Sequence, residues 1–258
     1  MCELLGISAK KKSQWNSVLR SFFSHSIDHP HGWGLAAFSG VGHSSLEKDC
    51  SEASRSPLLA DILSRPVEAR TLIAHIRRAT IGEIKYENCH PFVATDNRGR
   101  VWTLAHNGTI FTGADLNAYW CMQTGETDSE RILFHIIARI DAEQTRLGRG
   151  IDERERFAIL SEVVTELSTN NKLNLVVFDG EVLYIHTNFR DSLFYRHEGD
   201  ALLFATRPVD AGEWEPLPFT RLIAVNDGEF VREGPSHGHE YIHNPEDYRF
   251  VYMNFARL

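Results

Sequence analysis

The chain has 258 residues, a formal net charge of -8, 42% hydrophobic residues and 24% charged residues. This length can form one large domain or two small ones, and the composition is ordinary for a globular protein. The acidic balance argues against a general nucleic-acid binder, because phosphate recognition needs a basic face. No run approaches the roughly 20 apolar residues of a membrane span.

The N-terminal segment and the cysteines indicate the compartment. The lysines of residues 10–12 follow the apolar run of residues 4–7, which is the reverse of the order in a secretory signal. The four cysteines contain no CxxC pair and lack the density of a disulfide scaffold. We therefore expect a protein of the reducing cytoplasm.

Apolar patterning in the first third of the chain predicts two strands and a helix. Residues 2–7 are typical of a short buried strand that begins at the terminus. Apolar residues at helical spacing predict a helix over residues 13–24, and a glycine-flanked strand follows at residues 32–38. Residues 40–57 are polar and serine-rich, which predicts a surface loop.

Further strands and two long helices are expected after this loop. Residues 71–75 and 101–106 read as strands, and each ends in a polar turn. Asp128 is the predicted N-cap of a helix with one apolar stripe. A second amphipathic helix is predicted over residues 153–167.

The second half predicts successive antiparallel hairpins, with turns at Asp179-Gly180-Glu181, Glu198-Gly199-Asp200 and Asn226-Asp227-Gly228. Hairpins combined with two central helices indicate an α+β fold in which helices cover sheets. Nothing in the sequence forces a second domain, so residues 2–258 are taken as a single domain. Residues 235–258 form a polar and aromatic segment that the patterning does not place.

Cys2 is the first candidate for chemistry. Methionine removal is favoured by a small second residue, and it would leave a thiol and a free α-amine on the same residue. An α-amine has an ordinary pKa of about 7.7–8.0, so near neutral pH it can accept the proton of the thiol. Taken alone, however, a cysteine is more often an inert core residue.

Three further motifs contain groups that suit a polar substrate. Arg77 follows a strand end and has the planar fork that binds carboxylates. Asn107-Gly108 offers a side-chain amide and an unhindered backbone N–H, a pair that suits a developing oxyanion. Asp128 lies in a run of carboxylates at a helix start. Each also has a plainer interpretation, as a solvated arginine, an Asn-Gly turn and a helix cap.

The motifs and their order resemble those of the class II glutamine amidotransferases, the N-terminal-nucleophile hydrolases that use cysteine. The likeness covers roughly residues 2–232 and is greatest to small stand-alone members without a synthase domain. It rests on residues 2–6, 32–34, 75–82 and 87–92, together with Ala105-His106-Asn107-Gly108 and residues 125–130.

The resemblance implies a four-layer αββα sandwich and a role for each matching residue. Cys2 would attack the side-chain amide and form a γ-glutamyl thioester as ammonia leaves. Asn107 and Gly108 would form the oxyanion hole. Arg77, with Thr80 beside it, would bind the α-carboxylate of the substrate, and Asp128 would bind its α-ammonium group. No cofactor or metal is implied.

Two departures from the family pattern widen the range of substrates. Ile81 stands where the family often has histidine, and Arg78 where it often has an aromatic residue. The substrate is therefore glutamine or another γ-glutamyl amide. A non-catalytic module that senses glutamine or docks on a partner stays open as an alternative. A separate synthase subunit and a homo-oligomer stay open as partners, whereas nucleic acid and membrane are not expected.

The resemblance assigns no role to two histidine clusters and two cysteines. His237, His239 and His243 form one cluster, and residues 25–31 contain three more histidines. Metal sites need three or four converging ligands, and neither cluster has an evident remote partner. Both are therefore interpreted as polar loops or, for His31, as a position near the rim of the active site. Cys89 and Cys121 have no evident role beyond packing.

Overall fold

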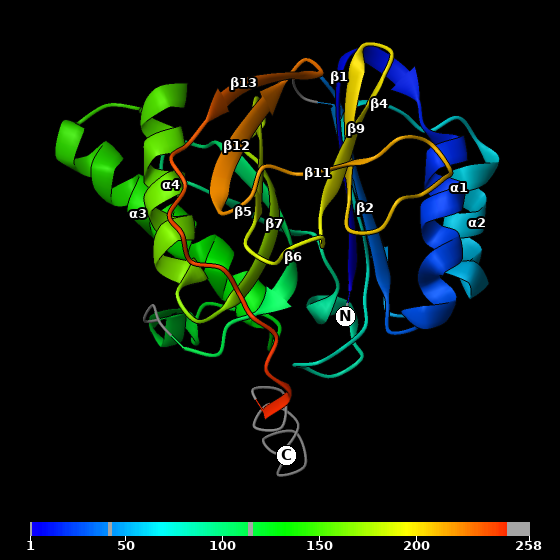
Figure 1. Cartoon of the computed structure of the whole chain (residues 1–258), viewed down its shortest axis with the longest axis horizontal. Helices are drawn as coiled ribbons and strands as arrows, with labels where there is room; N and C mark the ends of the chain where they lie inside the picture. Colours follow the sequence, from blue (N-terminus) through cyan, green and yellow to red (C-terminus); the bar gives the residue numbers. More distant parts are fainter. Residues whose placement is uncertain (1, 41–42, 113–115, 247–258) are drawn as a thin grey trace.

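The computed structural model describes residues 2–40, 43–112 and 116–246. In Figure 1 two antiparallel sheets lie face to face, with α1 and α2 outside one sheet and α3 and α4 outside the other. This is the predicted α+β arrangement of two sheets between helices, and it is confirmed. The four α-helices described are α1 (Asn16–Ser24), α2 (Pro57–Ser64), α3 (Asp128–Leu147) and α4 (Glu153–Ser168).

Within the described residues, the first sheet has the strand order β11-β9-β10-β1-β4-β2-β3. Its central strand is β1, which pairs antiparallel with both β10 and β4. The strands are β1 (Glu3–Gln14), β2 (Trp33–Gly40), β3 (His43–Asp49), β4 (Glu68–Ile76), β9 (Phe194–Glu198), β10 (Ala201–Ala205) and β11 (Glu215–Pro216).

The second sheet has the order β13-β12-β8-β7-β6-β5. Its hairpins β7–β8 and β12–β13 are the ones that the Asp-Gly turns predicted. The strands are β5 (Phe92–Thr95), β6 (Val101–Thr109), β7 (Lys172–Phe178), β8 (Leu183–Thr187), β12 (Arg221–Asn226) and β13 (Glu229–Glu233).

Both faces of each sheet are covered, so the central strands are apolar on both sides. In β1, Leu5 and Ile7 pack into the core beneath α1 and α2, whereas Leu4 points into the core between the sheets. A third core lies beneath α3 and α4. Because side chains alternate between faces along a strand, a strand covered on both sides appears in the sequence as a continuous apolar run.

Three predicted features are wrong. The strand predicted over residues 2–7 continues to Gln14, into the helix predicted over residues 13–24, so that α1 begins only at Asn16. Residues 40–57 are not a loop, because β3 pairs with β2 at the sheet edge and α2 begins at Pro57 after Ser56. An edge strand with an exposed face tolerates serines and charges, so its sequence lacks an apolar pattern. Within this stretch, residues 41 and 42 lie outside the described residues. Asp128 is also not the N-cap of α3, since the Thr127 side chain accepts the capping bond from the backbone N–H of Glu130.

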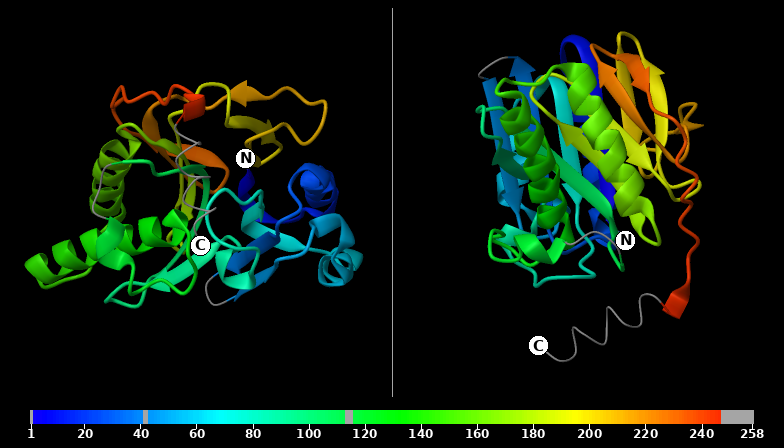
Figure 2. Two further views of the ribbon diagram at one scale, coloured as in Figure 1. Left: turned by 90° about the horizontal axis from the view of Figure 1, so that it is seen from below. Right: turned by 90° about the vertical axis from the view of Figure 1, so that its left-hand side faces the viewer.

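The C-terminal strap, residues 234–243, was not placed by the sequence. It is an extended segment that runs along the outside of the second sheet (Figure 2). Backbone N–H groups of Gly234, His237 and Tyr241 donate to carbonyls of Leu222, Thr220 and Asn188 at 2.8–2.9 Å. These bonds fix the strap to the ends of β8 and β12. Residues 247–258 lie outside the described residues.

Among the residues that the structure describes, no helix has the length and apolar character needed to cross a membrane.

Close packing around Gly34 gives a stability prediction. A Cβ added at Gly34 would lie 1.9 Å from the carbonyl oxygen of His90, where only backbone could give way. We expect Gly34→Ala to lower the free energy of unfolding by about 3 kcal/mol, measured by urea titration. Gly150→Ala is the control, because the nearest atom there is 3.8 Å away. Equal urea midpoints for the two variants would contradict this packing.

Candidate functional site

The predicted nucleophile lies at the end of the central strand β1. Glu3 pairs with Ile76 of β4, so Cys2 lies beside the backbone that follows β4. Its Sγ accepts from the Arg78 backbone N–H at 3.3 Å and lies 3.5 Å from the Arg78 carbonyl oxygen. The thiol is half-buried. Burial raises the pKa of Cys2, while the contact with Arg78 and the charges of Arg77 and Lys172 act in the opposite direction.

The Arg77 side chain is hydrogen-bonded to the loop that follows β4. Its side chain is 2% exposed, and burial lowers its pKa. Its guanidinium donates to the carbonyl oxygens of Ile81, Gly82 and Glu83 at 2.8–3.0 Å. An arginine has five N–H donors, so these three bonds leave two for other acceptors. Thr80 is half-buried within the same loop.

A network of carboxylate and amide contacts joins this loop to the start of α3. Glu126 accepts hydrogen bonds from the backbone N–H of Glu83 at 2.9 Å and from the Asn88 side chain at 3.0 Å, and pairs with Lys85. Asn88 also accepts from the Glu126 backbone N–H at 2.7 Å. The segment around residues 81–88 and the segment around residues 124–128 are thereby held against each other.

Asn107 and Gly108 lie near the end of β6, opposite Asn174 and Leu173 of β7. The Asn107 side chain is almost fully buried. A Cβ at Gly108 would lie 1.9 Å from the carbonyl oxygen of Lys172. Glycine is therefore required at position 108, because backbone of the neighbouring strand occupies the space of a side chain.

Asp128 connects the end of β6 to the first turn of α3. Its Oδ2 accepts from the backbone N–H of Ile110 at 2.8 Å, and its Oδ1 accepts from the Ser129 hydroxyl at 3.3 Å. Ser129 Oγ lies 3.0 Å from His106 Nδ1. The structure thus brings Asp128 to the same end of the second sheet as Asn107 and Gly108. Carboxylate oxygens accept more than one bond each, so Asp128 retains capacity for a cation.

Sequence reasoning missed two buried groups at this end of the fold. Lys172 begins β7 and is 1% exposed; burial lowers its pKa to about 8, while the charge of Cys2 acts to raise it. His106 lies 3.3 Å from the Lys172 carbonyl oxygen through Nε2. The only sequence signal for Lys172 is a lysine directly before an apolar strand, which is common at strand ends.

Two neutral histidine rings fill the space near Arg77. The ring centroids of His75 and His90 are 4.1 Å apart. Burial lowers the pKa of both well below the ordinary value, and the charge of Arg77 adds to the effect. Within the described part of the chain, neither ring nitrogen of His90 has a hydrogen-bond partner. The pair therefore supplies packing rather than charge.

The histidine clusters noted in the sequence have structural partners. His25 Nδ1 lies 2.8 Å from Glu3, and His31 Nδ1 accepts from the Ala79 backbone N–H. His186 Nε2 lies 3.0 Å from His237 Nε2 in the C-terminal strap. Over residues 2–40, 43–112 and 116–246, no group of three or more His, Cys, Asp or Glu side chains is arranged to hold a metal ion.

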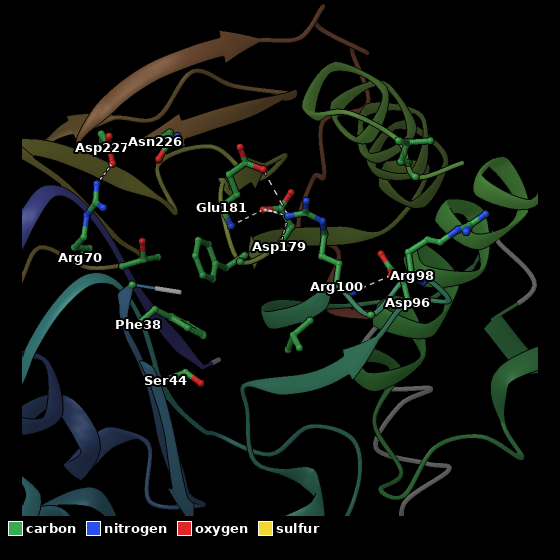
Figure 3. A pocket seen from close by; sticks show the side chains of 18 of the residues that line it. Phe38, Ser44, Arg70, Asp96, Arg98, Arg100, Asp179, Glu181, Asn226 and Asp227 are labelled. Carbon is green, nitrogen blue, oxygen red and sulfur yellow. Dashed lines mark hydrogen bonds and ion pairs between the residues drawn. The ribbon is translucent and has the colours of Figure 1, made fainter. Parts of the chain in front are cut away.

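Figure 3 shows a cavity of about 850 Å³. Its lining includes Arg70 near the start of β4, whereas Cys2 lies beside the other end of that strand, where Ile76 pairs with Glu3. Two of its arginines are paired with carboxylates of its own walls: Arg70 binds Asp227, and Arg100 lies 3.6 Å from the Glu181 carboxylate. Its described lining contains none of the predicted site residues. The cavity and the candidate site are therefore separate.

The model of a family described as class-II glutamine amidotransferases matches residues 1–201. YafJ of Escherichia coli is 29% identical over 193 residues, which cover 73% of this chain and 74% of that protein. The glutamine–fructose-6-phosphate aminotransferase (isomerizing) of Caulobacter vibrioides is 37% identical over 234 residues, covering 90% of this chain and 35% of that protein.

A solved structure shares the fold at low sequence identity. The glutamine phosphoribosylpyrophosphate amidotransferase of Bacillus subtilis superposes with a TM-score of 0.65 at 16% identity. The match covers 93% of this chain and 50% of that chain.

The contacts of Glu126 give a pH-dependent prediction. The bond from Lys85 is the largest of the effects that lower its pKa from 4.5 to about 2. The folded pKa is below the unfolded one, so the stabilisation is complete above about pH 4.5 and is lost as pH falls through about 2.

We expect Glu126→Gln to reduce the free energy of unfolding by about 1 kcal/mol at pH 7, since solvent screens this half-exposed pair, and by about half as much at pH 3. Urea titration at both pH values measures the difference. Glu87→Gln, on the same loop, is the control. If Glu126→Gln lost more free energy of unfolding at pH 3 than at pH 7, the lowered pKa of Glu126 would be refuted.

Proposed function

The chain belongs to the class II glutamine amidotransferases, and we propose that it releases ammonia from the side-chain amide of glutamine or another γ-glutamyl compound with Cys2 as the nucleophile. The observation that carries the proposal is the position of the half-buried Cys2 thiol. It contacts the backbone of Arg78, directly after Arg77, and is acted on by the charge of Lys172, whose carbonyl oxygen is the atom against which Gly108 packs.

The proposed reaction begins once Met1 has been removed. The Cys2 thiol transfers its proton to its own α-amine, and the sulfur attacks the amide carbon. The Asn107 amide and the Gly108 backbone N–H would stabilise the oxyanion that forms. The C–N bond then breaks, ammonia leaves with the proton held by the α-amine, and water hydrolyses the γ-glutamyl thioester.

Charge at the site matches a zwitterionic γ-glutamyl substrate. We assign Asp128 to the α-ammonium group and the two remaining donors of Arg77, with Thr80 beside them, to the α-carboxylate. The bonds from Arg77 to three carbonyl oxygens hold the guanidinium in one orientation before the substrate arrives. A preorganised donor loses less entropy on binding than a mobile one.

The nucleophile is tested by substitution and by N-terminal mass. The mature protein is expected to lack Met1, to release ammonia from glutamine and to form a covalent adduct on Cys2 with a diazoketone analogue of glutamine. Cys2→Ala should lower ammonia release by roughly 10³-fold or more. Cys121→Ser, an exposed thiol, should keep both activity and adduct. Binding of glutamine in a calorimeter without any ammonia release would instead favour a sensing module.

The roles of Asn107 and Asp128 differ in their kinetic signatures. Asn107→Ala removes a donor that acts in the transition state, so we expect kcat to fall by about 10²- to 10³-fold with little change in KM. Asp128→Asn removes a charge that would bind the substrate equally in the ground state and in the transition state, so we expect mainly a rise in KM. Steady-state ammonia release from glutamine measures both. A rise in KM alone for Asn107→Ala would rule out its role in the oxyanion hole.

A further inference from the structure

Glu3 is a buried carboxylate that directly follows the proposed nucleophile and that the proposed reaction does not use. The residue is 6% exposed. Side chains alternate between the two faces of a strand, and Leu4 points into the core between the sheets. Glu3 therefore points to the opposite face of β1, toward the layer of α1 and α2. A carboxylate is rarely buried without partners, because desolvation of its charge is costly, so its partners indicate its role.

Two histidines from the segment between α1 and β2 are partners of Glu3. This histidine segment, residues 25–32, begins with the 3₁₀ turn η1 (His25–Asp28). His25 Nδ1 lies 2.8 Å from Glu3 Oε2, and His29 Nε2 lies 3.8 Å from Glu3 Oε1. An ionised carboxylate only accepts hydrogen bonds, so His25 donates to Glu3. The His29 ring is in turn oriented by a contact of 3.0 Å between its Nδ1 and the His25 carbonyl oxygen.

A third partner reaches Glu3 from the strand on the other side of β1. Arg207, just after β10, lies 3.8 Å from Glu3 Oε1 and 3.8 Å from the Asp28 carboxylate in η1. The Leu4 backbone N–H donates to the Thr206 hydroxyl at 3.0 Å, and the Thr206 N–H donates to the Leu4 carbonyl oxygen at 3.1 Å. The start of β1 is thereby tied to both β10 and η1.

The histidine segment also holds the backbone that contacts the nucleophilic thiol. The His31 N–H donates to the Arg77 carbonyl oxygen at 3.0 Å, and the Arg77 N–H donates to the Gly32 carbonyl oxygen at 2.8 Å. Two residues further on, the Ala79 N–H donates to His31 Nδ1 at 3.0 Å. Arg78, whose N–H donates to the thiol, lies between these two anchored residues. One segment therefore fixes both the strand that carries the thiol and the backbone against which the thiol lies.

We propose that Glu3 is a positioning residue for Cys2, whose carboxylate bonds the start of β1 to the histidine segment so that the thiol keeps its place against the Arg78 backbone. The inference rests on the proposed function of Cys2. A well-packed apolar residue often replaces a buried ion pair at no cost in stability. A hydrogen bond is directional, however, so the pair with His25 fixes the orientation of the strand end in a way that an apolar contact does not.

The test measures how fast iodoacetamide alkylates each cysteine of the folded protein, with peptide mass spectrometry to resolve the sites. Cys2 is half-buried, Cys89 is buried and Cys121 is exposed. Burial raises the pKa of the Cys2 thiol more than the contact with Arg78 lowers it, so a displaced and more exposed thiol should react faster. Cys89 reports any opening of the whole fold, and Cys121 reports the activity of the reagent.

Glu3→Met removes the acceptor oxygens, and His25→Phe removes the donor. We expect either change to speed Cys2 alkylation by about 10-fold, the effect of one hydrogen bond to a charged group. We expect kcat for ammonia release to fall by about 10-fold or more with little change in KM. The double variant should show no further change, because both substitutions remove the same bond. Glu3→Gln keeps an oxygen that can accept from His25 and should stay within about 3-fold of the unmodified chain.

Glu153→Met is the matched control. The Glu153 carboxylate also joins two elements, because it pairs with Arg232 of β13 at 3.0 Å from the start of α4, but its charge is not among those that act on Cys2. Neither Cys2 alkylation nor kcat should change. Thermal unfolding of each variant identifies any that fails to fold, and substitutions on both sides of the Glu3–His25 pair give independent readings.

Unchanged Cys2 alkylation in folded Glu3→Met or His25→Phe would overturn the inference, as would a Glu3→Gln variant that behaves like Glu3→Met. An equal acceleration at Cys89 would also overturn it, because the whole fold would then have loosened. So would faster Cys2 alkylation with unchanged kcat. Alkylation requires no turnover. If the unmodified chain releases no ammonia, the proposed function fails, whereas an acceleration confined to Cys2 would still support the positioning role of Glu3.

Discussion

The site depends on the hydrogen-bond ladder of β1. This strand lies between β4 and β10 and is bonded on both sides, so its first residues cannot move independently of the sheet. A nucleophile at the second position of a chain would otherwise share the mobility of a free terminus. The pairing of Glu3 with Ile76 instead places Cys2 against the backbone of Arg78.

The surrounding groups are held by contacts with backbone in addition to side-chain pairs such as Glu126 with Lys85. Arg77 binds three carbonyl oxygens, Glu126 and Asp128 accept from backbone N–H groups, and Gly108 packs on a backbone oxygen. Such contacts are satisfied before any ligand binds, so the geometry of the site does not require the substrate to assemble it. Preorganisation of this kind is what an oxyanion hole requires.

The sheet strands were predictable because their sequences are continuous apolar runs between turn residues. Cys2, Arg77, Asn107 and Asp128 were proposed as site residues because their motifs stand in the order of a known family. Hydrophobic periodicity alone does not reveal that order. The edge strand β3 and the cap Thr127 were missed for physical reasons. An exposed edge strand has no apolar pattern in its sequence. The Asp128 carboxylate accepts a hydrogen bond from the backbone N–H of Ile110, while Thr127 caps the helix. The burial of Lys172 results from tertiary packing. A lysine at the start of a strand does not reveal this packing in the sequence.

The packing of Gly108 also constrains how this region can change in evolution. The atom that a side chain at position 108 would strike is the carbonyl oxygen of residue 172, and every amino acid has that oxygen. No exchange of the side chain at position 172 can therefore compensate for a larger residue at position 108. The two positions touch, yet they should vary independently among descendants of this sequence, with position 108 restricted to glycine whatever the side chain at position 172.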